Sequence, residues 1–144
     1  MFLNILVAVN GTPSSKRALE HAVDLARAMN SMLTLVVVAP HAAQSAAVAG
    51  VSNERMTKEL DDWAKRVLAE AASAVTDDVI AHTVQRVGDA GPEIVTELDR
   101  GGYDLIVVGS RGRGRAREGL LGSVNGHVHF HSRVPLLSVP GEEK

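Results

Sequence analysis

Three short, nearly unbroken apolar runs, separated by segments of helical periodicity, constrain the fold of this chain more than any other feature. The runs cover residues 3–9 (LNILVAV), 32–39 (MLTLVVVA) and 103–110 (YDLIVVGS). Unbroken runs of this length are typical of strands buried on both faces, as in a parallel sheet covered by helices. Residues 79–85 (VIAHTVQ) alternate more and predict an edge strand, and residues 134–140 (VPLLSVP) predict a last strand.

The segments between these runs predict helices. After the first run, Thr12 is a suitable N-cap and Pro13 suits the first helical position. The helix that follows is expected to end near Asn30, because its apolar residues recur at three- and four-residue spacing: Ala18, Leu19, Ala22, Leu25, Ala26 and Met29. A second, long helix is marked in the same way by Met56, Leu60, Trp63, Val67 and Ala71.

Two shorter helices complete the pattern. Residues 88–100 place Pro92 near a helix start, with Ile94 and Leu98 directed inward, and residues 122–133 predict a short, weak helix. Residues 41–50 are small and weakly patterned, so they form either a mobile loop or an extension of the following helix. We favour the loop.

The resulting order, βαβαβαβαβ, predicts one doubly wound α/β domain over residues 1–144, with right-handed crossovers. In open sheets of this kind, ligands bind beyond the carboxyl ends of the strands, where the strand order reverses. The loops after the first, second and fourth strands are therefore the expected binding loops. They carry NGTP, VAPH and GSRGRGRAREGLLGS.

Composition and charge narrow the class of partner. The formal net charge of −2 does not suit a general polyanion binder, so any phosphate affinity has to come from a local site. The chain has no cysteine, which removes disulfides and thiolate metal sites, and no apolar run approaches the length of a membrane span. We expect a soluble, cytoplasmic protein that binds neither membrane nor nucleic acid.

The stretch after the fourth strand combines glycines with four arginines. Glycines allow backbone amides to approach an anion, and a helix that starts behind them adds partial positive charge. Gly109, Gly112, Gly122 and Ser123 could therefore converge on one phosphate chain. The P-loop and the dinucleotide-binding motif both fail here, because the first lacks its lysine and the second its third glycine. An arginine–glycine nucleic-acid tail is not favoured, because such tails are long and rich in aromatic residues.

The spacing Gly109-x2-Gly112-x9-Gly122-Ser123 resembles the signature of the nucleotide-binding branch of the universal stress protein family. The resemblance extends over nearly the whole chain, including ILVAVNGTPSSKRALEHAVDLA, LTLVVVAP, YDLIVVGSRGRG and VPLLSV. It implies a Rossmann-like, adenine nucleotide alpha hydrolase-like fold: a five-stranded parallel sheet in the order 3-2-1-4-5, with helices on both faces. It also implies a homodimer that pairs through the C-terminal strand.

The resemblance further implies a site for ATP or another adenine nucleotide, with Mg²⁺ able to enter through the phosphates. The matching positions are Ala8 and Asn10 after the first strand, Val38 at the end of the second, and a phosphate and ribose set that consists of Gly109, Gly112, Gly122, Ser123 and Val124. Asn10 departs from the family, which commonly has Asp there. This change leaves the recognition of ribose and metal open and raises cyclic AMP as an alternative ligand.

A regulatory binding module in stress physiology is the function that these features favour. A slow ATP hydrolase is less favoured, because Asn10 replaces a carboxylate, and no residue is assigned a catalytic role. A nucleotide-free protein-interaction module is the other alternative. His127 and His131 lie four residues apart, as metal ligands can, but no nearby carboxylate or cysteine completes a site, so we predict no metal centre.

Overall fold

Five parallel strands form one sheet in the order β3-β2-β1-β4-β5 in the computed structural model, which describes residues 1–110 and 123–141. The strands are β1 (Asn4–Ala8), β2 (Met32–Ala39), β3 (Ala81–Val87), β4 (Leu105–Gly109) and β5 (Leu136–Val139). The helices are α1 (Pro13–Met29), α2 (Ala42–Ala49), α3 (Asn53–Ser73), α4 (Ala90–Gly101) and α5 (Ser123–His131). The predicted doubly wound fold and its strand order are confirmed.

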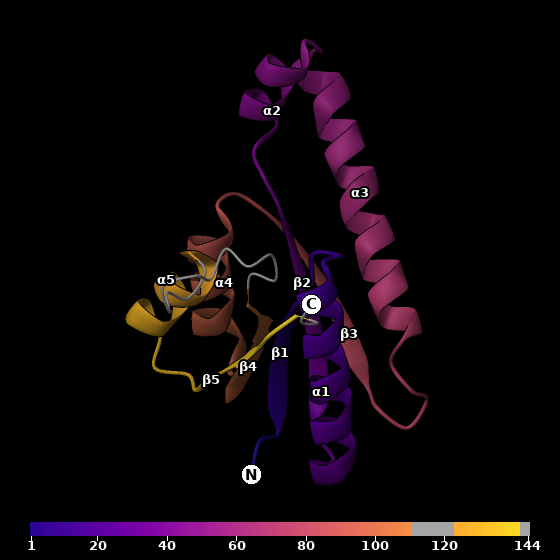
Figure 1. Cartoon of the computed structure of the whole chain (residues 1–144), viewed down its shortest axis with the longest axis vertical. Coiled ribbons are helices and arrows are strands. Elements are labelled where there is room, and N and C mark those ends of the chain that lie inside the picture. The colour runs from indigo at the N-terminus through magenta and orange to yellow at the C-terminus, as the bar shows by residue number, and fades with distance from the viewer. Residues whose placement is uncertain (111–122, 142–144) are drawn as a thin grey trace.

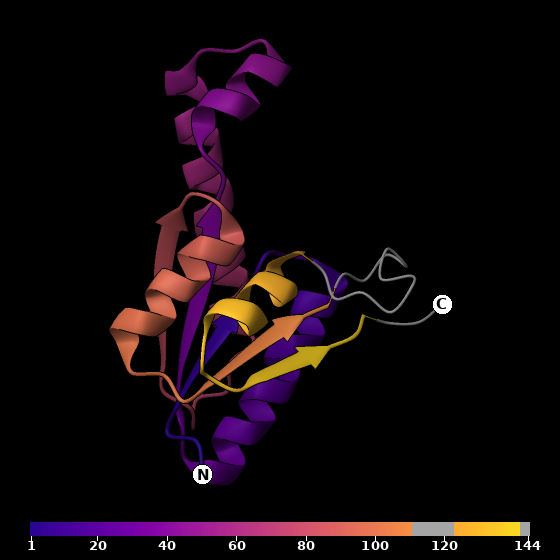
Figure 2. The same cartoon turned by 90° about the vertical axis from the view of Figure 1, so that its left-hand side faces the viewer.

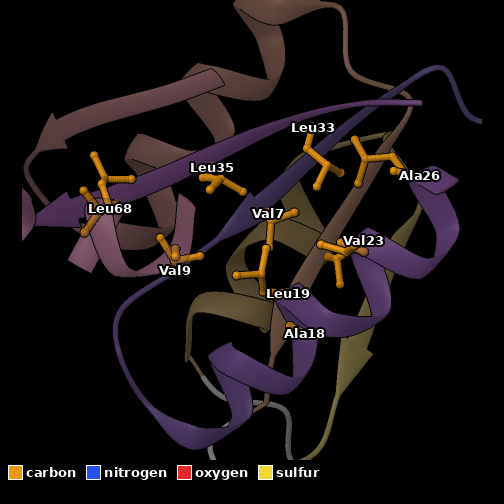
Figure 3. Packing of buried hydrophobic residues seen from close by; sticks show 14 of the residues in the cluster. Val7, Val9, Ala18, Leu19, Val23, Ala26, Leu33, Leu35 and Leu68 are labelled. Atoms are coloured by element: carbon orange, nitrogen blue, oxygen red, sulfur yellow. The ribbon is translucent and has the colours of Figure 1, made fainter. Parts of the chain in front are cut away.

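Alternate residues of the central strands face opposite sides of the sheet, and this alternation separates two apolar cores. Ile5 and Val7 of β1 point toward α1 and α3, whereas Leu6 points toward α4 and α5. Figure 3 shows Val7 and Leu35 beside Leu19 of α1 on the first face. Figure 2 shows α4 and α5 covering the other face. Burial on both faces explains why these strands are almost entirely apolar.

The start and end of α1 follow local rules. Thr12 is the N-cap, its hydroxyl accepts a hydrogen bond from the backbone N–H of Ser15, and Pro13 occupies the first turn. Asn30 ends the helix in the left-handed conformation, with φ of 57°. These ends confirm the predicted boundaries of the helix. The sequence could predict them because the residues that set them are part of the segment itself.

The expectation of a loop over residues 41–50 is wrong. These residues form a separate helix, α2, which is alanine-rich and ends at Gly50. Gly50 has φ of 74°, and its N–H donates to the carbonyl of Ala46 at 2.9 Å. Alanine has the highest helix propensity, which favours this helix. Ala46 is its buried residue, so the helix lacks the apolar stripe by which most helices are recognised in a sequence.

The pair α2 and α3 extends past the carboxyl ends of the strands. Figure 1 shows α2 and the N-terminal half of α3 beyond the sheet, while the C-terminal half of α3 lies along it. The buried residues of this C-terminal half belong to the core shared with α1: Ala64, Val67, Leu68 and Ala71. In the part of the chain that the structure describes, no helix is long and apolar enough to cross a membrane.

Candidate functional site

A cavity of about 820 Å³ lies at the carboxyl ends of β1, β2 and β4. Its strand side is lined by strand ends and the residues after them: Ala8, Val9, Asn10, Val36, Val38, Val108, Gly109 and Ser110. The helices contribute Thr12, Pro13, Ser14, Ser15, Trp63, Ala90, Ile94, Val124 and Asn125. Because β1 pairs with both β2 and β4, this is the point where the strand order reverses and where ligands are expected in such sheets.

The structure brings several predicted site residues to this cavity. Ala8, Asn10, Val38, Gly109 and Val124 lie in its wall. Ser123 is the first residue of α5 and is exposed, next to Val124 in the chain but not in the cavity wall. Gly112 and Gly122 lie outside the described residues, as do the arginines at positions 111, 113, 115 and 117. Contact of these residues with a nucleotide stays a prediction.

Asn10 organises the turn between β1 and α1. Its Oδ1 atom accepts hydrogen bonds from the backbone N–H of Thr12 at 3.1 Å and from the Thr12 hydroxyl at 2.7 Å. Its own N–H donates to Ser15 Oγ at 3.1 Å. The side-chain oxygen therefore performs the acceptor role of an Asx turn, which both Asn and Asp can supply. Asn10 thus supports the turn without placing a negative charge in the cavity wall.

Gly109 is required by packing. A Cβ atom at this position would lie 2.6 Å from both the carbonyl oxygen and the Oγ of Ser14. Its φ is not in the left-handed region, so its value here is the absence of a side chain rather than conformational freedom. The glycine lets the first turn of α1 approach the end of β4 and close one side of the cavity.

Asn125 is a functional candidate that the sequence analysis missed. Its side chain is almost fully buried, at 2% exposed, and its Nδ2 atom donates to Ser138 Oγ at 2.8 Å. This bond joins α5 to β5 beside the cavity. A buried amide in a short, weakly patterned helix is the signal that could have identified it, because buried polar side chains need partners.

Trp63, Ala90 and Ile94 also line the cavity without having been predicted as site residues. The spacing of Trp63 and Ile94 placed both on the buried faces of helices. That assignment is correct for both: Ile94 is 2% exposed and belongs to the core beneath α4, and Trp63 is partly buried against the core shared with α1. Periodicity identifies an inward face, but it does not distinguish the core from a cavity that opens at the end of the same sheet.

A polar cluster anchors α4, whose first turn reaches the cavity. Arg86 of β3 donates to Glu93 at 2.8 Å and to Glu97 at 2.9 Å, and the Tyr103 hydroxyl donates to the other oxygen of Glu97 at 2.8 Å. The hydrogen bond to Glu93 raises the pKa of the Arg86 guanidinium above its usual value. Burial raises the pKa of Tyr103, and the hydrogen bond to Glu97 adds to that effect. The cluster connects the edge strand to α4.

The two histidines of α5 that have metal-ligand spacing pack against each other. The rings of His127 and His131 stack with centroids 4.1 Å apart and planes 23° apart. His131 Nδ1 donates to the carbonyl of His127 at 2.9 Å. Metal ions bind imidazole nitrogens in the plane of the ring, so stacked rings do not direct two nitrogens at one ion. The described residues contain no group of three or more His, Asp or Glu side chains that could hold a metal.

Comparison with known proteins adds a family to this geometry. The model of the universal stress protein family matches residues 1–140. Universal stress protein YxiE of Bacillus subtilis (strain 168) is 31% identical over an alignment 147 residues long. The alignment covers 96% of this chain and 99% of that protein. Hypothetical protein MJ0577 has a similar structure, with a TM-score of 0.84 at 23% identity, over 100% of this chain and 99% of that one. A universal stress protein in complex with cAMP has a TM-score of 0.65 at 25% identity, over 98% of this chain and 99% of that one.

Proposed function

The chain belongs to the universal stress protein family, and from that premise we propose that it binds an adenine nucleotide as a regulatory module of stress physiology. The observation that carries the proposal is the cavity at the reversal point of the sheet. Its volume of about 820 Å³ is within the range of about 300–1,000 Å³ that is usual for small-molecule sites. The similarity to a universal stress protein in complex with cAMP supports this class of ligand.

The two sides of the cavity suit the two ends of a nucleotide. Val38 of β2, which is partly exposed beside the buried Val36, offers an apolar surface for the base. On the far side of β1, Gly109 ends β4 and Ser110 follows it, and the N-terminal turn of α5 contributes Val124 and Asn125. Free N–H groups and the helix dipole at such a terminus favour phosphate. Gly112, Gly122 and Ser123 are proposed to complete the phosphate side.

The first test is to identify what the protein carries. Freshly purified protein is denatured and the released small molecules are identified by mass spectrometry, followed by calorimetric titration with ATP, ADP, AMP and cAMP. We expect an adenine nucleotide in the first measurement, saturable binding in the second, or both. A preparation that releases no nucleotide and binds none of the four would contradict the proposal and favour a nucleotide-free interaction module.

A matched pair of variants tests the phosphate side. Gly122→Asp places bulk and negative charge in the glycine motif, so we expect at least a tenfold loss of nucleotide affinity. Gly126→Asp makes the same substitution in α5, where a Cβ meets no atom within 4 Å, so we expect affinity close to that of the wild type. Equal affinity in both variants would show that the motif does not bind the phosphates.

Cyclic AMP is a second candidate ligand. It is favoured by the cAMP complex of a related universal stress protein and by Asn10, which carries no charge where the family commonly has Asp. Competition between cAMP and ATP for one site, with and without Mg²⁺, ranks the two ligands. Tighter binding of ATP when Mg²⁺ is present would indicate that ATP binds as its Mg²⁺ complex.

The same proposal includes a cytoplasmic homodimer formed through β5. This strand is at the edge of the sheet, and Leu137 is 37% exposed there, which leaves an apolar strand edge available for pairing. Leu137→Lys should weaken the dimer in analytical ultracentrifugation. Val87→Lys, on the opposite edge strand and also exposed, is the control and should leave it unchanged. A monomeric wild type, or a dimer that withstands Leu137→Lys but not Val87→Lys, would contradict this interface.

A further inference from the structure

Trp63 occupies the point where α3 leaves the body of the protein. The residues that follow it on α3, beginning with Ala64, pack into the core shared with α1. The residues before it include Met56 and Leu60, which line a separate groove of about 600 Å³ with Pro40, beyond the end of β2. Figure 1 shows this N-terminal half of α3 beyond the sheet. Trp63 is therefore a boundary residue between the core and the projecting helices.

Trp63 lines both the groove and the main cavity, so this residue separates the two. Trp63 is the only tryptophan of the chain. Among the four aromatic residues of the chain, Phe2, Trp63, Tyr103 and Phe130, it is the one that lines the cavity as the structure describes it. The residue is partly exposed rather than buried and lies in the cavity wall, so a ligand in the cavity can reach it.

The position of Trp63 relative to the sheet assigns it to one end of the cavity. It shares the groove with Pro40, the residue directly after β2, so it lies on the β2 side. The strand β1 separates β2 from β4, which carries Gly109 on the phosphate side. Val38 packs against the core covered by α4 and α5, whereas Trp63 packs against the core covered by α1 and α3, so the two residues border the cavity from opposite faces of the sheet. The base of a bound nucleotide is proposed to lie over the β2 end, between these two sides of the wall.

We propose that Trp63 is a base-contacting residue of the cavity, whose indole face gives the site its affinity for a purine rather than for phosphate and ribose alone. The inference rests on the proposed nucleotide-binding function and extends it to a residue outside the glycine motif. Contact between a base and an aromatic side chain contributes about 1–3 kcal/mol by truncation, which corresponds to about 5- to 150-fold in affinity.

Intrinsic fluorescence tests the contact in the wild-type protein. All tryptophan emission comes from Trp63, because the chain has no other tryptophan. Titration with ATP or AMP should shift or quench the emission saturably, with N-acetyltryptophanamide titrated in parallel to correct for absorption. Ribose monophosphate and inorganic tripolyphosphate, which lack the base, should leave the emission unchanged. An adenine nucleotide that binds by calorimetry without changing the emission would overturn the proposal.

Variants then separate base contact from packing. Trp63→Leu keeps an apolar side chain against the core but removes the aromatic face, so the affinity for ATP and AMP should fall by about 5- to 150-fold. Trp63→Phe should retain most of the affinity that Trp63→Leu loses. Ribose monophosphate should bind both variants as it binds the wild type. Leu60→Ala, which changes the groove but not the cavity, is the matched control and should bind ATP and AMP normally.

The outcomes distinguish this inference from the proposed function. If the wild type binds adenine nucleotides and Trp63→Leu binds them equally well, the role of Trp63 is refuted while nucleotide binding stands. An equal loss of affinity for AMP and ribose monophosphate would show that Trp63 only supports the shape of the cavity. A wild type that binds no adenine nucleotide would overturn both.

Discussion

Gly109 and Ser14 are in contact where the end of β4 meets the first turn of α1, and a Cβ on Gly109 would lie 2.6 Å from the Ser14 carbonyl oxygen. Residues 95 positions apart in the sequence thus close one side of the candidate nucleotide cavity. The contact explains why this position needs a glycine for packing alone, whether or not a ligand binds.

Gly109→Ala should destabilise the protein by about 1–3 kcal/mol, because the added methyl group meets backbone that cannot move without displacing α1. Urea denaturation measures the free energy of unfolding. Gly126→Ala is the control: its Cβ would meet nothing within 4 Å, and alanine is favoured over glycine in a helix by about 0.5–1 kcal/mol. We expect that variant to be as stable as the wild type or more so. Equal stability of the two variants would contradict the close packing.

Asn10 and Thr12 allow a second prediction, about the turn before α1. Asn10→Ala removes the acceptor of two hydrogen bonds and should lower the free energy of unfolding by about 1 kcal/mol. Asn10→Asp keeps the acceptor and adds a negative charge near the N-terminus of α1, which is worth about 0.3–1 kcal/mol in favour of folding. We therefore expect Asp to be neutral or stabilising in chemical denaturation. If Asn10→Asp lowered the free energy of unfolding as much as Asn10→Ala, the hydrogen bonds of the Asx turn would not be the source of the stability.

Asn125 and Ser138 provide a third prediction, which concerns the junction of α5 and β5. Asn125→Ala and Ser138→Ala should each cost about 1–3 kcal/mol, because each leaves a polar partner without its hydrogen bond. In a double-mutant cycle, the double variant should lose less than the sum of the two single losses. Strict additivity of the two losses would indicate that the bond contributes nothing to stability.

Tyr103 supports a prediction about alkaline pH. Burial raises its pKa above the ordinary value of 10.0, so the folded protein holds the phenolic proton more tightly than the unfolded chain does. The stabilising contribution is fully present below pH 10 and is lost as the pH rises through the folded-state pKa. The free energy of unfolding of the wild type should therefore fall more steeply above pH 10 than that of Tyr103→Phe. If the free energy of unfolding fell equally steeply with pH in the wild type and in Tyr103→Phe, this prediction would be wrong.

The titration itself can be followed directly. The chain has one tyrosine, so tyrosinate absorbance reports Tyr103 alone. Its midpoint should lie above that of the protein unfolded in urea. Glu97→Gln keeps a hydrogen-bond acceptor but removes the charge beside the hydroxyl, so it should lower the midpoint toward the ordinary value.

Features set by neighbouring residues could be predicted from the sequence, whereas one helix that lacks an apolar stripe could not. The α1 boundaries were predictable because Thr12 and Asn30 act on neighbouring backbone groups. The place of the cavity at the strand ends was predictable because parallel strands bring their carboxyl ends to one edge. The helix α2 was not, because its alanines lack an apolar stripe, and its conformation depends on propensity and on the burial of Ala46 against the rest of the fold.

By itself, the sequence determined the strands, most of the helices, the family and the motif that points to phosphate. These follow from periodicity, from caps and from residues at fixed spacing, all of which act over short distances along the chain. Only the tertiary structure decided which side chains share the cavity wall. Trp63, Asn125 and the Gly109–Ser14 contact depend on segments that are distant in sequence, and chain folding alone brings them within contact distance.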